Sequence, residues 1–481
     1  MKMVNTRVIL LFILTLFLTA CTKSGGGRGG ASTSSETKKI TILHVNDVHA
    51  NIDNFSKLKW YVDQEQAKGT TVFLFCAGDI FSGNPVVDMD EDPGRSVIEL
   101  MNACGFDAMA VGNHEFDYGK DILKSRIEQS KFPWISSNII KKPRKFDIEE
   151  SVVLEKGGVK IALVSSLETG GGNNPPIPST HPSKVKGFKF ENPLSFDTWF
   201  KGVKDKTSAD LLIDLSHFGV SEDSKLAEAN TDFDLIIGGH SHTKLSQVLN
   251  VNGTPIVQAG SKLWYLGRLD LEVKDRKIQE LDYNLIDFRD IDNKDENLKN
   301  RIAEIDDAPA LKEVIGLAKD KIDKPYEVGC LYTDALKIGL KCDVAIQNVG
   351  GIRAYIDEGD ITLEDVFKVD PFGNGAVTCK MTYGDLKKIM ETYNSEILVS
   401  GISYTRKNGK VELLSEDGKA VNLDQSIKVA TNDYLYEVLK DSFPKKCTQT
   451  GTKTVEVIID YIKSFKMEPI SYDDCKRFEW K

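Results

Sequence analysis

Five short motifs in the chain combine histidine, carboxylate and amide side chains that can bind a metal ion. Each motif follows a short apolar run that is typical of a buried β-strand. In chain order, the candidate ligands of the five motifs are Asp47 and His49, Asp79, Asn113, His217, and His240 and His242. If the apolar runs are neighbouring strands of one buried sheet, the motifs meet at one edge of it, where open sheets place their chemistry. The sequence therefore predicts one site built from all five motifs.

The types of these side chains indicate a catalytic metal site. Imidazole nitrogens are mixed with carboxylate and amide oxygens, and none of the five motifs contains cysteine. This mixture suits hydrolytic Zn²⁺, Mn²⁺ or Co²⁺ better than a structural zinc site or an iron–sulfur cluster. The alternative is a set of unrelated histidines in loops and in the core. A single Asp-X-His or Gly-Asp motif would not exclude that alternative, but the ordered set of five favours the metal site.

Two other histidines are expected to be structural. His44 lies inside the first apolar run, where a packed histidine is more common than a metal ligand. His181 lies in the proline-rich stretch from Pro175 to Pro182, which is typical of a surface loop. Such a loop could cover an active site, but nothing in its sequence requires that.

The ordered motifs carry a resemblance to a known family. Asp-X-His, Gly-Asp, Gly-Asn-His-Glu-Phe-Asp, Ser-His and Gly-His-Ser-His, in this order, resemble the calcineurin-like metallophosphoesterase superfamily. The segments 348–353 (Asn-Val-Gly-Gly-Ile-Arg) and 371–374 (Pro-Phe-Gly-Asn) narrow the resemblance to the 5′-nucleotidase family, which includes UDP-sugar hydrolases and 2′,3′-cyclic-nucleotide phosphodiesterases. The resemblance covers nearly all of the chain after about residue 38.

The resemblance implies two divalent metal ions. The first ion would be held by Asp47, His49, Asp79 and His242, and the second by Asp79, Asn113, His217 and His240. Asp79 suits the bridging position because a carboxylate has two oxygens, whereas an imidazole presents one nitrogen to a metal. Two ions about 3.5–4 Å apart can activate a water molecule and hold phosphate oxygens during in-line attack on phosphorus.

His114 has a different role in the family pattern, where it stabilises the transition state or assists the leaving oxygen and is oriented by the aspartate of the same motif, here Asp117. A histidine whose tautomer is fixed by a carboxylate is a suitable general acid. Asp117 could also be the N-cap of a helix that follows it. For Glu115 the sequence leaves two readings open, a partner of a metal ligand or a buried structural acid.

Substrate-binding residues are expected in the second half of the chain. Paired glycines let the backbone approach a ligand, and Arg353 offers a planar fork to phosphate oxygens. The family context adds Asn348, Phe372 and Asn374 as weaker candidates. The chain departs from nucleotide-specific members, which hold the base between two aromatic segments. The residues that could replace that clamp are Tyr404, Tyr434, Tyr436 and Phe443.

The length of 481 residues exceeds what one hydrophobic core usually supports. The expected fold class is α/β, with a metallophosphoesterase α/β sandwich over residues 38–285. A charged linker helix is expected over 286–324, and a smaller C-terminal α/β substrate-binding domain over 325–481. The formal net charge of −10, without a basic run among aromatics, argues against binding of polymeric nucleic acid.

The N-terminus has the features of an export signal. Residues 1–20 combine a short basic region with an apolar run too short to span a membrane, and small residues precede Cys21 as in a bacterial lipobox. Residues 21–37 would form a flexible Gly/Ser tether. The prediction is a lipoprotein anchored to a membrane through Cys21 and facing the periplasm or the cell exterior. The alternative is an ordinary secretory peptide. The seven other cysteines are odd in number, so at least one thiol stays free.

The sequence therefore predicts an exported enzyme that hydrolyses small phosphoesters, with nucleoside 5′-monophosphates as the leading substrates. The alternatives among enzymes are a 2′,3′-cyclic-nucleotide phosphodiesterase with 3′-nucleotidase activity and a UDP-sugar pyrophosphatase. A surface solute-binding lipoprotein is the alternative outside enzymes. The bridging carboxylate and His114 argue against it, because a binding protein needs neither. The oligomeric state does not follow from the sequence.

Overall fold

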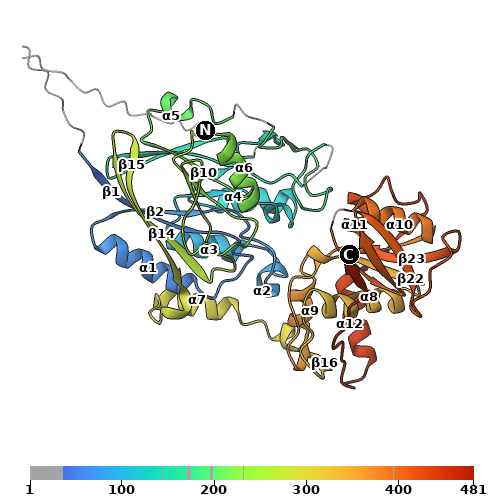
Figure 1. The fold of residues 1–481 in the computed structure, drawn as a ribbon. Helices are drawn as coiled ribbons and strands as arrows, with labels where there is room; N and C mark the ends of the chain where they lie inside the picture. Colours follow the sequence, from blue (N-terminus) through green and yellow to red (C-terminus); the bar gives the residue numbers. More distant parts are fainter. Residues whose placement is uncertain are drawn as a thin grey trace, which may run out of the picture. The chain divides into compact units, whose positions relative to one another are not determined.

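Two β-sheets packed face to face form the N-terminal part of the chain, from Lys38 to Asp287 (Figure 1). The computed structural model describes residues 36–144, 146–170, 175–195, 199–230, 232–393 and 395–480. The predicted signal peptide, the predicted lipidation site Cys21 and nearly all of the predicted tether lie outside these residues. Thr37–Lys481 group into one unit by their contacts.

The sheets are mainly parallel in their centres. One has seven strands in the order β15-β14-β1-β2-β3-β4-β6, and the other has six in the order β12-β13-β11-β10-β8-β7. The strands are β1 (Lys38–Val45), β2 (Thr71–Cys76), β3 (Ala108–Ala110), β4 (Trp134–Ile135), β6 (Ile148–Glu149), β7 (Val152–Lys156), β8 (Val159–Val164), β10 (Leu211–Leu215), β11 (Leu235–Ile237), β12 (Leu249–Val251), β13 (Thr254–Val257), β14 (Tyr265–Lys274) and β15 (Lys277–Asp287). A small additional sheet pairs β5 (Ile139–Lys141) with β9 (Lys189–Phe190).

Alternating side chains explain why these strands lie between two apolar layers. On β1, Ile40 and Ile42 face the second sheet, whereas Leu43 and Val45 pack toward helices. The helices of this part are α1 (Phe55–Ala67), α2 (Pro85–Asp88), α3 (Arg95–Cys104), α4 (Lys120–Gln129), α5 (Val203–Lys206) and α6 (Val220–Ala229). The predicted α/β sandwich is confirmed, since buried strands are covered by each other on one face and by helices on the other.

The C-terminal part is a smaller α/β arrangement built on a five-stranded sheet with the order β20-β17-β23-β19-β24. The strands of the whole C-terminal part are β16 (Val314–Ala318), β17 (Val344–Asn348), β18 (Gly359–Thr362), β19 (Gly375–Thr382), β20 (Ile397–Ser400), β21 (Ile402–Lys407), β22 (Lys410–Ser415), β23 (Ser426–Asn432), β24 (Cys447–Lys453) and β25 (Phe478–Trp480). Its helices are α8 (Tyr326–Gly339), α9 (Leu363–Val369), α10 (Tyr383–Thr392), α11 (Asp433–Val438) and α12 (Thr454–Ser464).

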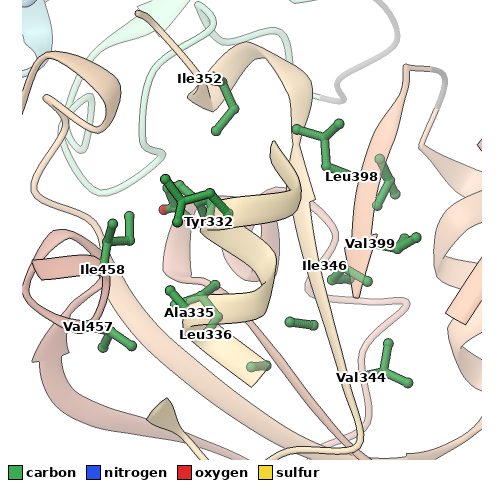
Figure 2. Close-up of a cluster of buried hydrophobic side chains, with 14 of the residues drawn as sticks. Tyr332, Ala335, Leu336, Val344, Ile346, Ile352, Leu398, Val399, Val457 and Ile458 are labelled. Atoms are coloured by element: carbon green, nitrogen blue, oxygen red, sulfur yellow. The ribbon is translucent and has the colours of Figure 1, made fainter. Parts of the chain in front are cut away.

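Helix α8 is central to the C-terminal core. Figure 2 shows Tyr332, Ala335 and Leu336 of this helix beside side chains of β17, β20 and α12. Tyr332 is fully buried, and its hydroxyl donates a hydrogen bond to the carboxylate of Asp370 at 3.0 Å. Because this core is separate from the cores of the two large sheets, the C-terminal part has apolar burial of its own.

The predicted linker segment, residues 286–324, contains helix α7 (Glu296–Ile305) and strand β16. Helix α7 packs on the N-terminal part, where Arg301 forms an ion pair with Glu99 at 2.8 Å. Strand β16 pairs with β18 and therefore lies with the C-terminal part. The domain boundaries at 285 and 324 stay a prediction.

Both disulfides of the described residues lie in the C-terminal part. They join Cys330 to Cys475 and Cys379 to Cys447. The free thiols are Cys76 and Cys104, which are buried in the N-terminal part, and Cys342. The odd number of cysteines outside Cys21 thus leaves free thiols, as the sequence requires. Within the described ranges, no helix has both the length and the apolar character needed to cross a membrane.

His44 on β1 is fully buried, and neither ring nitrogen has a hydrogen-bond partner. Its ring stacks on Tyr283, with 6.1 Å between the ring centres, and a Cβ at the facing Gly267 would overlap the imidazole. Burial lowers the pKa of His44 to about 3 because the charged ring has no compensating group. The expected structural role of this histidine is therefore confirmed, and the site does not include it.

His44 is expected to make the fold sensitive to acid. Its pKa in the folded chain lies below that in the unfolded chain, so its contribution is complete above about pH 6.5 and is lost as the pH falls. At pH 5 the loss is about 2 kcal/mol of the free energy of unfolding, from about 1.4 kcal/mol per pH unit. Denaturant titrations at pH 7.5 and pH 5, with chelator present, should show a smaller decrease for His44→Leu than for the wild type. An equal decrease in both proteins would contradict this assignment.

Candidate metal centre and active site

The five sequence motifs lie at the carboxyl ends of five strands. Asp47 and His49 follow β1, Asp79 follows β2, and Asn113 follows β3. His217 follows β10, and His240 and His242 follow β11. The expectation that the five runs are neighbouring strands of one sheet is wrong, because β1, β2 and β3 belong to the seven-stranded sheet and β10 and β11 to the six-stranded sheet. The motifs nevertheless meet, since the two sheets face each other with these ends together.

The candidate ligands form groups whose donor atoms all lie within 4.8 Å of one another. One group contains Asp47, His49 and His242, and another contains Asp79, His217 and His240. The shortest contacts are His49 Nε2 to His242 Nε2 at 2.9 Å, Asp79 Oδ2 to His217 Nε2 at 3.1 Å, His240 Nδ1 to Asn113 Oδ1 at 3.1 Å, and Asp47 Oδ1 to His242 Nε2 at 3.3 Å. All seven side chains that the sequence singled out as ligands are thus brought together.

Five of these seven residues have left-handed backbone conformations. The φ angles are 51° at Asp47, 49° at His49, 54° at Asp79, 72° at His240 and 54° at His242. Such angles cost roughly 1–2 kcal/mol for each residue that is not glycine. Backbone strain of this kind is concentrated at functional sites, where the surrounding structure holds it. Here the backbone N–H groups of Asp47 and His49 donate to the carbonyls of Gly78 and Asp79 at 2.9 and 3.0 Å.

The ring nitrogens present unshared electron pairs toward the centre of the site. His217 donates through Nδ1 to the carbonyl of Ala77 at 2.7 Å, so in the neutral ring Nε2 carries the unshared pair, and this atom faces Asp79 Oδ2 at 3.1 Å. His49 likewise donates through Nδ1 to the carbonyl of Ser82 at 3.0 Å, so its Nε2 is an acceptor. Acceptors that face each other across about 3 Å repel unless a cation lies between them. The donor set therefore fits divalent metal ions.

The electrostatics of the site also favour a positive charge. Although burial lowers the pKa of His217, the carboxylate of Asp79 outweighs it and raises this pKa to about 10. Burial and the nearby charge of Arg353 lower the pKa of His49, which keeps that ring neutral. Asp79 thus attracts a cation, whether a proton on His217 or a metal ion, while His49 offers a neutral imidazole.

Glu115 stabilises the backbone of two loops that carry candidate metal ligands. Its carboxylate accepts backbone hydrogen bonds from Asp79 at 2.9 Å, from Ile80 at 2.7 Å and from Gly112 at 2.5 Å. The first two N–H groups belong to the loop after β2 and the third to the loop after β3. Of the two readings that the sequence left open, the structure favours the partner of a metal ligand, because Glu115 fixes the backbone of Asp79 itself.

His114 and Asp117 form a hydrogen-bonded pair at the edge of the site. His114 Nδ1 lies 2.6 Å from Asp117 Oδ2, and His114 Nε2 lies 3.9 Å from Asp79 Oδ2. Burial lowers the pKa of His114, but the carboxylates of Asp79 and Asp117 outweigh it and raise this pKa. The alternative role of Asp117 as a helix N-cap is wrong, because helix α4 begins after Gly119 and no side chain caps it.

A cavity of about 530 Å³ adjoins the ligand groups. Its walls include Asp79, Asn113, His114, Asp117, Thr180, His181, His240 and His242 from the N-terminal part, and Asn348, Arg353, Phe372, Asn374, Tyr393, Asp433 and Tyr434 from the C-terminal part. All four substrate-binding candidates from the sequence therefore line one cavity with metal-ligand candidates. Arg353 Nη2 lies 3.4 Å from His49 Nε2, and the ring of Phe372 stacks on His114 with 5.6 Å between centres.

The structure separates the aromatic candidates for base binding. Tyr434 lines the cavity, whereas Tyr404 is buried in the core and bonds to the backbone of Ile397. Tyr436 packs against Phe443, and neither lines the cavity. Tyr393, which lies at the end of helix α10 and faces the same cavity, is marked by no sequence motif. Only its place in the fold reveals it.

The expected surface loop around His181 is confirmed, because residues 175–182 form no helix or strand and most of them are exposed or half-buried. The loop also borders the cavity, a role that the sequence left open. The side chain of His181 is 17% exposed and lines the cavity beside Asp117 and Asp433. The neighbouring Thr180 is buried, and its hydroxyl donates to Asp117 Oδ1 at 2.7 Å. The proline-rich composition gave no sign of these contacts, which depend on residues far away in the sequence.

Comparison with known proteins agrees with this geometry. The calcineurin-like phosphoesterase family model matches residues 40–244, and the model of the 5′-nucleotidase C-terminal domain matches residues 308–444. The chain is 28% identical to a 5′-nucleotidase of Vibrio vulnificus, over 90% of this chain and 91% of that protein. It is also 28% identical to the trifunctional nucleotide phosphoesterase of Bacillus subtilis, over 82% of this chain but 32% of that protein.

A solved structure shows the same fold. The 5′-nucleotidase precursor from Thermus thermophilus superposes with a TM-score of 0.79 at 23% identity, over 92% of this chain and 99% of that chain. The two family models follow each other in the order of the two parts described above, and together they match more than half of the chain. The chain therefore belongs to the 5′-nucleotidase family of calcineurin-like phosphoesterases, and it is a phosphoester hydrolase.

Proposed function

We propose that the chain hydrolyses nucleoside 5′-monophosphates to nucleoside and phosphate with the help of two divalent metal ions. The observation that carries this proposal is the position of Asp79. Its carboxylate lies in one ligand group with His217 and His240 and in another with His49 and His114. A carboxylate in that position can bridge two cations, which is the requirement for a dinuclear centre.

The proposed ligand sets follow the sequence assignment. Asp47, His49, Asp79 and His242 would hold the first ion, and Asp79, Asn113, His217 and His240 would hold the second. Asn113 supports its place in the second set, because its amide nitrogen donates to the carbonyl of Ser179 at 3.1 Å and leaves the oxygen directed at His240. The mixed nitrogen and oxygen donors suit Zn²⁺, Mn²⁺ or Co²⁺. When bound, such ions supply positive charge to phosphate oxygens and make a water molecule more acidic.

The chain's own residues would orient the phosphate and protonate the leaving oxygen. Arg353 lies beside His49 and presents its guanidinium to the cavity, where it would bind phosphate oxygens through two N–H groups. His114 would donate the proton at Nε2, since Nδ1 is held by Asp117. Asn348 and Asn374 would contribute amide contacts from the C-terminal wall, and Phe372 would keep His114 and Arg353 apart by its ring.

Nucleotides are the leading substrates because the aromatic side chains of Tyr393 and Tyr434 line the same cavity. Stacking of a nucleobase on such rings would contribute on the order of 1–3 kcal/mol. Cyclic nucleotides and nucleotide sugars carry the same groups, so they belong in the same assay as alternatives.

A substrate panel with metal control is the direct test. We expect the chain without its first 21 residues to hydrolyse 5′-AMP, to lose this activity with a chelator, and to regain it with Zn²⁺, Mn²⁺ or Co²⁺. The panel adds 3′-AMP, a 2′,3′-cyclic nucleotide, a UDP-sugar and p-nitrophenyl phosphate, and the readout is kcat/KM for each. Faster turnover of a cyclic or diphosphate substrate would replace the nucleotidase proposal. No metal-restored turnover at all would favour a solute-binding protein.

Export and lipid anchoring at Cys21 are part of the proposal. Two disulfides in the C-terminal part support an oxidising compartment, because disulfides persist mainly outside the cytosol. Attachment through Cys21 predicts that labelled palmitate enters the full chain in a bacterial host. Unchanged labelling of a Cys21→Ser variant would refute the anchor.

A further inference from the structure

The loop from Pro175 to Pro182 touches the acid pair on one side and the substrate cavity on the other. The hydroxyl of Thr180 donates to Asp117 Oδ1, while His114 takes the other oxygen of the same carboxylate. The next residue, His181, lines the cavity beside Asp433 of the C-terminal part. Two adjacent residues therefore connect the proton donor with the far wall of the cavity.

The contacts of His181 fix its tautomer. The backbone N–H of Ser183 donates to His181 Nδ1 at 3.2 Å, and the hydroxyl of Ser183 lies 2.7 Å from the same atom. A backbone amide only donates, so Nδ1 is the acceptor nitrogen. Burial lowers the pKa of His181, which favours the neutral ring. The proton of the neutral ring is then on Nε2, the nitrogen nearest to Asp433.

A donor and an acceptor thus stand in the cavity wall without hydrogen bonds. Within the described residues, neither His181 Nε2 nor Asp433 Oδ1 has a partner, and both atoms are almost fully shielded from solvent. His181 Nε2 lies 3.8 Å from Asp433 Oδ2, which is too far for a hydrogen bond. Buried polar atoms are usually paired, because an unpaired one is costly. A ligand that both donates and accepts would pair the two.

We propose that His181 and Asp433 bind the leaving alcohol of the substrate through a neutral group that donates and accepts hydrogen bonds. This inference rests on the proposed function and extends it from the phosphate to the leaving group. A sugar hydroxyl meets the description, and so does the edge of a nucleobase. Tyr393 and Tyr434 line the same cavity and would cover the apolar faces of such a group.

Thr180 gives this binding site a link to catalysis. Because Thr180 and His181 are joined by one peptide bond, the loop that binds the leaving group also holds Asp117 and, through it, His114. Thr180 is therefore a positioning residue for the proton donor. Its loss should matter for leaving groups that need a proton and should matter little for p-nitrophenolate, which leaves readily without one.

KM values for three substrates, measured in His181→Ala and Asp433→Ala variants, test whether these residues bind the leaving alcohol and which part of it they bind. We expect KM for 5′-AMP to rise roughly tenfold, as for the loss of a hydrogen bond in a buried site, with KM for p-nitrophenyl phosphate within about twofold of the wild type. Ribose 5-phosphate identifies the group that is bound: a similar rise indicates the sugar, and no rise indicates the base. The double variant should be little worse than either single variant, because both side chains bind one group.

The Thr180 variants test the link. Thr180→Val keeps the shape but removes the hydroxyl, and we expect kcat for 5′-AMP to fall roughly tenfold, a part of the full general-acid effect, while KM and metal content stay unchanged. Hydrolysis of p-nitrophenyl phosphate should change little. Thr180→Ser keeps the hydroxyl and should restore kcat. Equal kcat values for Thr180→Val and Thr180→Ser would show that Thr180 only supports the fold. An equal loss of kcat for 5′-AMP and p-nitrophenyl phosphate would show the same.

Binding of adenosine distinguishes failure of this site from failure of the proposed function. Adenosine has no phosphate, so calorimetry measures the leaving-group site without turnover. Weaker adenosine binding by His181→Ala would support the site even if the wild type proved to prefer another phosphoester. Unchanged adenosine binding, or a KM increase that is equal for 5′-AMP and p-nitrophenyl phosphate, would overturn it.

Discussion

Asp79→Asn is expected to release both metal ions and to lower kcat/KM for every phosphoester by more than about 100-fold. Changes in the partners of metal ligands already cost 10–100-fold, and Asp79 is assigned to both ions directly. Asparagine has one carbonyl oxygen and no charge, so it cannot bridge two cations. In the folded chain Asp79 Oδ1 also accepts the backbone N–H of His114 at 2.8 Å, while Oδ2 faces His217. Elemental analysis and kcat/KM on the substrate panel measure the two effects.

A matched carboxylate outside the site serves as the control for Asp79→Asn. Glu99 forms an ion pair with Arg301 in the N-terminal part, and Glu99→Gln should keep two metal ions per chain and full activity. A partial result would also be informative. If Asp79→Asn retained two ions per chain, Asp79 would not be the bridge, and the ligand sets would need another shared residue.

His114→Ala is expected to lower kcat for 5′-AMP by roughly 10²–10⁴-fold, the usual contribution of general acid–base catalysis. The physical reason is the position of Nε2, which faces the ligand groups while Asp117 holds Nδ1 at 2.6 Å. Because His114 is not assigned as a ligand, the variant should keep two metal ions. Initial rates with 5′-AMP and p-nitrophenyl phosphate should show the larger loss for 5′-AMP, whose leaving oxygen needs the proton more.

A second variant and a metal analysis accompany His114→Ala. Asp117→Asn keeps a hydrogen-bonding side chain beside His114 but removes the charge, so its loss of kcat should be smaller than that of His114→Ala. Elemental analysis is the decisive measurement for the role of His114. Loss of one metal ion would make it a ligand, and an unchanged kcat would remove it from catalysis.

The set of site residues could be predicted because each motif follows an apolar strand run. The carboxyl ends of neighbouring parallel strands lie at the same edge of a sheet. The residues that follow these strands, Asp47, Asp79 and Asn113, therefore lie close together regardless of the conformation of the segments that connect the strands. The division into two sheets was not predictable in this way. An apolar run such as that of β10 or β11 indicates that the strand is buried on both faces. It does not indicate which sheet the strand joins.

The residues that the sequence missed are defined by contacts over long distances. Thr180 is marked by no motif, and its importance comes from the hydrogen bond to Asp117. Tyr393, which no motif marks, faces the cavity because helix α10 ends there. Among the aromatic candidates that the sequence did offer, Tyr434 lines the cavity at the start of α11, whereas Tyr404 is enclosed in the core. Residue type and spacing carry no information on such differences, since they arise only when distant segments pack.

Strand β1 lies between β2 and β14, so during synthesis one of its two partner strands is made much later than the other. β1 is the first strand of the described chain, and its residues from Lys38 to His44 pair with β14 from Val273 to Gly267. A nascent chain that ends before Tyr265 therefore has an open edge on β1, to which other chains can add. Contacts this distant in sequence also form slowly. Asp47, in the first candidate ligand motif to leave the ribosome, consequently gains its full set of neighbours late, since its carbonyl accepts the backbone N–H of Lys262 at 2.7 Å.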